Sequence, residues 1–120
     1  MAINLDTISI PELEEMLYKL AHKCYAIDKE FIQADEQFQI LDDNRKSYLA
    51  SIVDKQSGKT TAEKERAALQ SAEYLGWLEG YQAARRASRQ ARVEKDNIIR
   101  LYETARSILS SRNTQKRAGI

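Results

Sequence analysis

The chain has 120 residues, enough for one domain, and its net charge is close to neutral at +1. A charged fraction of 31% with only four glycines and one proline suits long solvated helices and argues against a sheet protein, which needs frequent turn residues. The single cysteine excludes an intrachain disulfide, so we expect a cytoplasmic protein. No apolar run exceeds four residues, so we expect no contact with a membrane.

The near-neutral total conceals a segregation of charge along the chain. Residues 1–50 carry ten acids and five bases, whereas residues 81–120 carry three acids and ten bases. An acidic first part and a basic last part attract each other if they lie antiparallel. Clustered lysine and arginine on one helix is also the electrostatic pattern of a nucleic-acid binder.

The first long helix is predicted over residues 10–53. Ser9, Pro11 and Glu12 form a capping-box pattern at its start, where proline has no donor to lose. Apolar residues then recur at alternating steps of four and three, interrupted only by Arg45, which is the pattern of a coiled-coil helix that keeps one face against a partner. This first row consists of Leu13, Leu17, Leu20, Cys24, Ile27, Phe31, Ala34, Phe38, Leu41, Arg45, Tyr48 and Ile52.

A polar link is predicted over residues 54–60, where Gly58 is placed to end a helix. Thr60 and Glu63 offer a second capping box. They predict a short helix over residues 61–70.

The second long helix is predicted over residues 72–111, with Ser71 as its cap. Residues 112–120 form a basic tail that we expect to be disordered. The helix has its own row at steps of four and three, and the middle of this row is small where the first row is large. This second row consists of Trp77, Tyr81, Ala84, Ser88, Ala91, Lys95, Ile98, Tyr102, Ala105 and Leu109.

The two rows fit each other if the chain folds back at the polar link. Phe31 and Phe38 then face Ala91 and Ala84, and large against small side chains is what close packing requires. The sequence therefore predicts an all-α fold in a single domain over residues 1–120, a long helical hairpin with coiled-coil packing.

A further apolar stripe lies beside the first row. Tyr18, Tyr25 and Ile32 recur at intervals of seven residues and widen the apolar face beyond what one partner helix covers. Packing inside the hairpin can use this stripe, but a contact between copies is the stronger interpretation. We therefore expect the hairpin to assemble into a homo-oligomer.

The sequence offers no arrangement of residues for catalysis or for metal binding. His22 and Cys24 point in nearly opposite directions on a helix, so they cannot share a metal. Gly58, Lys59 and Thr60 match the end of a phosphate-binding loop, but the earlier glycine of that motif is missing and no strand precedes it. We therefore expect neither enzyme activity nor a cofactor.

Six cations of the second long helix are the candidate nucleic-acid-binding residues. Three aspartates spaced by seven on the first helix offer the alternative of ion pairs across the hairpin, and an acidic protein partner is a third interpretation. Aligned cations without interleaved aromatic residues bind phosphate with little sequence preference and strong salt dependence. Trp77 and Tyr81 can stack on bases only if exposed, and their place in the second row favours burial. The cations are Arg85, Arg86, Arg89, Arg92, Lys95 and Arg100, and the aspartates are Asp28, Asp35 and Asp42.

The predicted parts follow one another in a particular order. A long helix and a short polar link are followed by the stretch Thr61-Ala62-Glu63-Lys64-Glu65-Arg66. After it come Ala72-Glu73-Tyr74 and a basic helix that ends in Ile108-Leu109-Ser110-Ser111-Arg112. This order of parts resembles small helical phage proteins related to UvsY, the recombination mediator of T-even phages. The resemblance implies a ring-like homo-oligomer in a bacterial host that binds single-stranded DNA. It also implies loading of a recombinase onto strands coated by single-strand binding protein. The family's DNA contact includes a Lys-x-Arg pair near the end of the first helix, and Arg45 and Lys46, adjacent rather than spaced, are the nearest match.

Two classes of function are therefore expected. The first is a non-enzymatic recombination accessory protein that contacts single-stranded DNA through its basic helix. The alternative is a protein–protein module, either a helical adaptor or a phage-encoded inhibitor of a host nuclease or defence complex.

Overall fold

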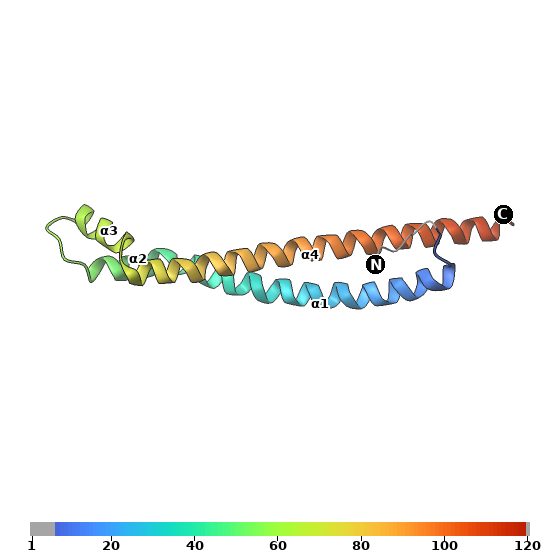
Figure 1. Cartoon of the computed structure of the whole chain (residues 1–120), viewed down its shortest axis with the longest axis horizontal. Coiled ribbons are helices and arrows are strands. Elements are labelled where there is room, and N and C mark those ends of the chain that lie inside the picture. The colour runs from blue at the N-terminus through green and yellow to red at the C-terminus, as the bar shows by residue number, and fades with distance from the viewer. Residues whose placement is uncertain (1–6, 120) are drawn as a thin grey trace. The chain divides into compact units, whose positions relative to one another are not determined.

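The structure, a computed structural model, describes residues 7–119, and every regular element in that range is a helix. In chain order these are α1 (Ile10–Asp43), α2 (Arg45–Asp54), α3 (Thr61–Leu69) and α4 (Ala72–Arg117) (Figure 1). The prediction of an all-α fold is confirmed for this part of the chain. No helix within it combines the length and the apolar character that a membrane crossing requires.

The described residues divide into two compact units. The first unit contains residues 7–31 and 91–119, and the second contains Ile32–Gln90. Helices α1 and α4 therefore each contribute one segment to each unit, and each unit has an apolar cluster of its own.

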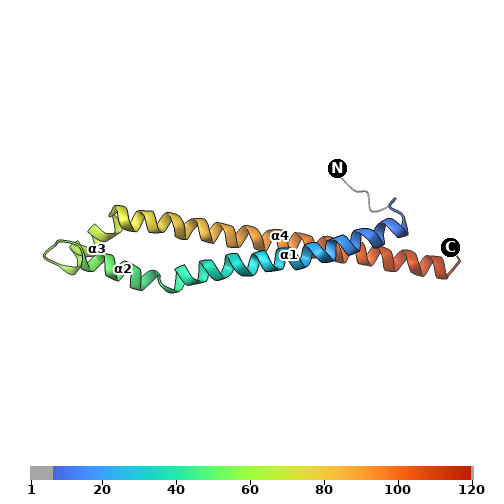
Figure 2. The same cartoon turned by 90° about the horizontal axis from the view of Figure 1, so that it is seen from below.

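In the first unit, the N-terminal part of α1 packs against the C-terminal part of α4. Leu13 and Ala105 are completely inaccessible to solvent and form the buried cluster together with Leu20. The start of α1, in blue, lies beside the red end of α4 in both Figure 1 and Figure 2, so these two segments are antiparallel. The half-buried residues around the cluster are Ile8, Met16, Leu17, Ile98, Tyr102, Ile108 and Leu109.

In the second unit, residues of α2, α3 and the start of α4 form the cluster. Ile52 and Ala68 are inaccessible to solvent, and Tyr74 is buried beside them. These residues come from three different helices, so the cluster holds the short helix α3 in place. The half-buried residues around it are Tyr48, Leu49, Val53, Trp77 and Leu78.

An aromatic stack extends the cluster of the second unit. The Trp77 ring stacks on Tyr48 and on Tyr81, with ring centroids 5.3 Å and 5.2 Å apart. The Tyr81 ring also contacts Phe38 at 5.4 Å. Trp77 is therefore packed within the fold against aromatic neighbours, as its place in the second row predicts.

The two predicted rows face inward. Every apolar member of the first row and every member of the second row is buried or half-buried, and Arg45 is the exposed exception. In the first unit the Phe31 ring lies against the side chains of Arg92 and Lys95, close to the Ala91 position that the fold-back predicts.

The helix predicted over residues 10–53 is divided at Asn44, which separates α1 from α2. The side-chain amide of Asn44 donates to the carbonyl oxygen of Ile40 at 2.9 Å, and such bonds compete with regular helix geometry. The backbone N–H groups of Asn44 and Tyr48 still donate to the carbonyls four residues earlier. The interruption between α1 and α2 is therefore confined to the residues around Asn44.

Both predicted capping boxes supply a cap. The Ser9 hydroxyl accepts from the backbone N–H of Glu12, and the Thr60 hydroxyl accepts from that of Glu63, each at 3.2 Å. The Glu63 carboxylate in turn accepts from the backbone N–H of Lys59 at 2.9 Å. The segment that matches the end of a phosphate-binding loop is therefore the cap of α3.

Helix α4 continues beyond its predicted end. The sequence predicts its end at residue 111 and a disordered tail over residues 112–120, whereas α4 extends to Arg117. Residue 120 lies outside the described residues. Lys116 and Arg117 occupy its last turn, where cations complement the negative end of the helix dipole. Gly119 follows with φ of 77°, a left-handed conformation that glycine adopts without strain. The helix therefore continues through the basic residues and ends two residues before Gly119.

Candidate nucleic-acid interface

Three of the predicted phosphate-binding cations lie on the part of α4 that belongs to the second unit. Arg85, Arg86 and Arg89 are all exposed. Within the described chain no ion pair joins their guanidinium groups to a carboxylate. Their charges are therefore solvated, and an anionic ligand can reach all three.

The aspartates of α1 in this unit bond to other donors. The Tyr81 hydroxyl donates to Asp42 Oδ1 at 2.7 Å, and the Ser88 hydroxyl donates to Asp35 Oδ1 at 3.1 Å. Tyr81 and Ser88 are buried members of the second row. In this unit the two aspartates therefore satisfy donors inside the fold and do not neutralise the arginines of α4.

The hydrogen bond to Asp42 raises the pKa of Tyr81 above its ordinary value of 10.0, because losing the proton breaks the bond and places two negative charges side by side. Burial of the phenol acts in the same direction, and the positive charges of Arg45 and Arg85 partly oppose the rise. The Tyr81 phenol is therefore a neutral donor that keeps its proton to unusually high pH.

We expect Tyr81→Phe to make the fold less sensitive to alkali. Because the folded pKa exceeds the unfolded one, the Tyr81–Asp42 bond stabilises the fold fully below about pH 10 and is lost as the pH rises through the folded pKa. The melting temperature, measured from about pH 8 to about pH 12, should fall more steeply for the wild type than for the variant. Tyr25→Phe, at an exposed ring, is the control, and equal slopes for all three proteins would contradict the expectation.

Two further predicted cations have partners within the first unit. Lys95 Nζ forms an ion pair with Asp28 Oδ1 at 2.7 Å and lies 5.0 Å from the centre of the Phe31 ring. The guanidinium of Arg92 lies over the same ring at 5.4 Å. Arg100 is exposed, and within the described chain it has no ion pair. Lys95 and Arg92 therefore contribute to packing in this unit, whereas the charge of Arg100 is solvated.

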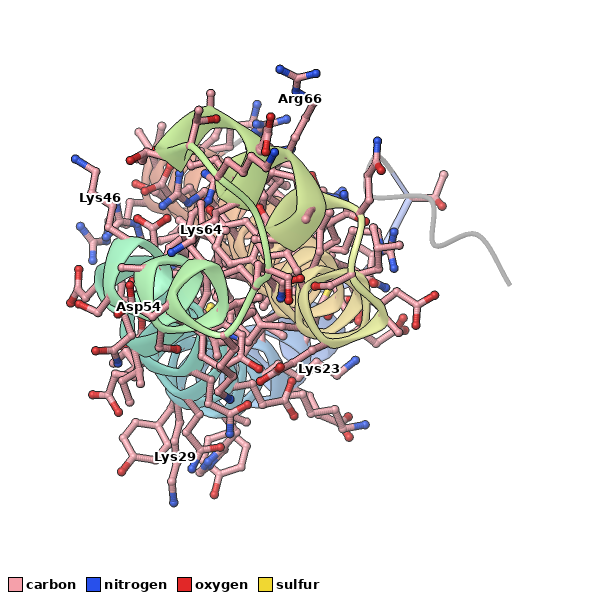
Figure 3. All side chains as sticks on the ribbon, turned by 90° about the vertical axis from the view of Figure 1, so that its left-hand side faces the viewer. Lys23, Lys29, Lys46, Asp54, Lys64 and Arg66 are labelled. Carbon is pink, nitrogen blue, oxygen red and sulfur yellow. The ribbon has the colours of Figure 1, made fainter. Side chains whose placement is uncertain are left out.

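Arg45 and Lys46 differ in their surroundings within the second unit. The guanidinium of Arg45 lies 5.4 Å over the Tyr81 ring, a cation–π contact that explains a charged residue in an otherwise apolar row. Lys46 is exposed at the edge of a groove of about 340 Å³ between α2 and α3, and its side chain projects into solvent (Figure 3). Arg45 thus already has a partner in the fold, and Lys46 is the more accessible cation.

The predicted oligomer stripe is uncovered within each unit. Tyr18 and Tyr25 of the first unit are 68% and 77% exposed, and Ile32 of the second unit is 48% exposed. The His22 ring contacts Tyr18 edge to face, with centroids 4.6 Å apart. Large exposed rings of this kind are enriched at protein interfaces.

Among residues 7–119 no cluster of three or more histidine, cysteine or acidic side chains is arranged to hold a metal ion. The Cys24 thiol is free and half-buried in the first row.

Comparison with known proteins yields no relative. The chain matches no family model, no curated protein and no solved structure. Its function is therefore argued from its own residues.

Proposed function

We propose that this protein is a non-enzymatic recombination accessory protein of mediator type, which binds single-stranded DNA through Arg85, Arg86 and Arg89. The observation that carries the proposal is that these three guanidinium groups are exposed and form no ion pair within residues 7–119, while Asp35 and Asp42 accept hydrogen bonds from buried hydroxyls. Solvated cations grouped on a helix retain their full attraction for phosphate.

The composition of this stretch favours binding without base recognition. Arg85 and Arg89 lie about 6 Å apart along the helix axis, and Ala87 and Ser88 between them carry no ring that stacks on a base. Tyr81, the nearest ring along the helix, is buried, and the ring of Trp77 stacks on Tyr48 and Tyr81. We therefore expect contacts to the phosphate backbone and little dependence on sequence.

We further propose that the helices form a hairpin with coiled-coil packing that assembles into a homo-oligomer. The exposed Tyr18, Tyr25 and Ile32 support this assembly. We call the exposed Arg85, Arg86 and Arg89 the arginine surface. Several copies of the arginine surface held together bind one long strand far more tightly than a single copy does. Such multivalent binding suits the loading of a recombinase onto strands coated by single-strand binding protein.

The exposed tyrosines also favour the alternative, a protein–protein module. A helical adaptor, or an inhibitor of a host nuclease or defence complex, would use Tyr18 and Tyr25 as anchors on its target. In that case the arginine surface meets an acidic protein surface instead of DNA.

Binding of fluorescent oligonucleotides across a salt series separates these functions. We expect single strands to bind more tightly than duplexes, with a logarithmic salt slope of about −2 from three phosphate contacts. Equal affinity for duplex would contradict the single-strand assignment. Absence of binding at low salt would refute the DNA function and favour the adaptor or inhibitor.

A further inference from the structure

A groove of about 340 Å³ lies in the first unit, beside the start of α1. Its apolar lining comes from Ile8, Met16 and Leu20 on one side and from Leu101 of α4 on the other. Leu101 is 41% exposed, a large value for a leucine that lies beside buried residues of its helix. An apolar surface of this kind is stabilised when another surface covers it.

The charged lining of the groove is ordered by sign. Glu12, Glu15, Lys19 and Lys23 recur at steps of three and four, so they share one face of α1. Both acids precede both bases, and the ends of the row lie about 16 Å apart along the helix. All four side chains are exposed. This face is therefore negative at one end and positive at the other.

We propose that this groove binds the same groove of a second copy of the chain, with the two α1 helices antiparallel about a two-fold axis that crosses the charged face at the level of Leu17 along the helix. An antiparallel copy presents the charges in reverse order. Glu12 then lies opposite Lys23 of the second copy, and Glu15 lies opposite Lys19. The two-fold axis repeats each contact, so four ion pairs surround two apolar linings that cover each other.

The existing ion pair between Glu15 and Lys19 does not oppose this contact. These side chains are 3.1 Å apart, but each is 67% exposed, and exposed pairs one turn apart on a helix contribute little to stability. Exchanging partners between copies keeps the same number of opposite charges in contact. The contact is small and bordered by solvated charges, so we expect it to be weak and to weaken further with added salt.

The inference rests on the self-assembly in the proposed function, but it places a contact on another face of α1. Tyr18 and Tyr25 point away from the face that carries Met16 and Lys23. Two distinct contact surfaces on one unit allow assemblies larger than a dimer.

Charge-exchange variants test the contact directly. Glu12→Lys with Glu15→Lys makes the row entirely basic, and Lys19→Glu with Lys23→Glu makes it entirely acidic. Each variant alone should self-associate about tenfold or more weakly than wild type, because like charges then oppose each other. Mixing the two variants should restore association to the wild-type level, measured by sedimentation with one variant fluorescently labelled.

A matched control variant tests whether the position of the exchanged charges matters. Glu30→Lys with Glu36→Lys changes the same charge at exposed positions outside the groove and should leave self-association unchanged. If loss of the acidic side chain of Glu12 from the first turn of α1 unfolds the basic variant, the milder exchange of Glu15→Lys against Lys19→Glu replaces it.

Three results would overturn the contact: a monomeric wild type at about 100 μM, charge variants that associate like wild type, or no recovery on mixing. If only Tyr25→Lys dissociates the protein, self-assembly uses the stripe of Tyr18, Tyr25 and Ile32. This contact is then refuted, while the proposed function stands. If the exchange pattern holds but no oligonucleotide binds, the proposed function fails and the contact stands.

Discussion

Replacing Ile52 by alanine should lower the free energy of unfolding by about 2–5 kcal/mol. Ile52 is inaccessible to solvent and packs with Ala68 and Tyr74, so the truncation leaves a cavity where three helices meet. Helix α3 has nine residues, and an isolated helix of that length is unstable in water. Its place depends on this cluster. Denaturant unfolding followed by the fluorescence of Trp77, which packs against the cluster, measures the loss.

Ile40→Ala is the matched control in the same unit. Ile40 is 59% exposed, so the same truncation removes few contacts and should cost less than about 0.5 kcal/mol. Equal losses for the two variants would contradict the assignment of Ile52 to the core.

The inward face of each long helix is predictable from the sequence because it depends on spacing alone. Steps of four and three return to one side of a helix, and the residues at those steps, from Leu13 to Ile52, are buried or half-buried apart from Arg45. The division at Asn44 and the extension to Arg117 depend on local hydrogen bonds and end effects, which the spacing does not encode.

The partners of the α1 aspartates required the structure. Their spacing of seven predicts contacts across the helix pair, but it does not distinguish the arginines beside the second row from the polar residues within it. The structure selects the row, in which Tyr81, Ser88 and Lys95 are also spaced by seven. In order, Asp28, Asp35 and Asp42 contact Lys95, Ser88 and Tyr81.

That selection explains which part of the candidate site is open to a ligand. A polar residue inside an apolar row is costly to bury unless it has a partner, so the aspartates are needed there. A guanidinium beside the row keeps its water and needs no partner. Arg85, Arg86 and Arg89 are therefore left exposed by the same contacts that satisfy the core.

Replacing Arg85, Arg86 and Arg89 together by glutamine should weaken single-strand binding to a similar extent for all sequences. Each phosphate of a single strand that the protein no longer neutralises reduces the logarithmic salt slope by about 0.7, so three such phosphates reduce it by about 2. The fold should be unaffected, because the three side chains form no ion pair within the described chain and glutamine is a good helix former. Arg92 stays unchanged because its guanidinium packs on Phe31.

The matched control removes the same charge elsewhere, with Lys29→Gln, Arg66→Gln and Lys116→Gln. All three cations are exposed, and Lys29 and Arg66 each project into solvent (Figure 3). An equal reduction of the slope in this control would show that net charge, not the arginine surface, drives binding. An unchanged slope in the arginine variant, with a normal melting temperature, would exclude the surface and transfer the assignment to Arg100 or Lys46. Because the two variants carry the same net charge, any difference between their slopes measures the phosphate contacts of this surface alone.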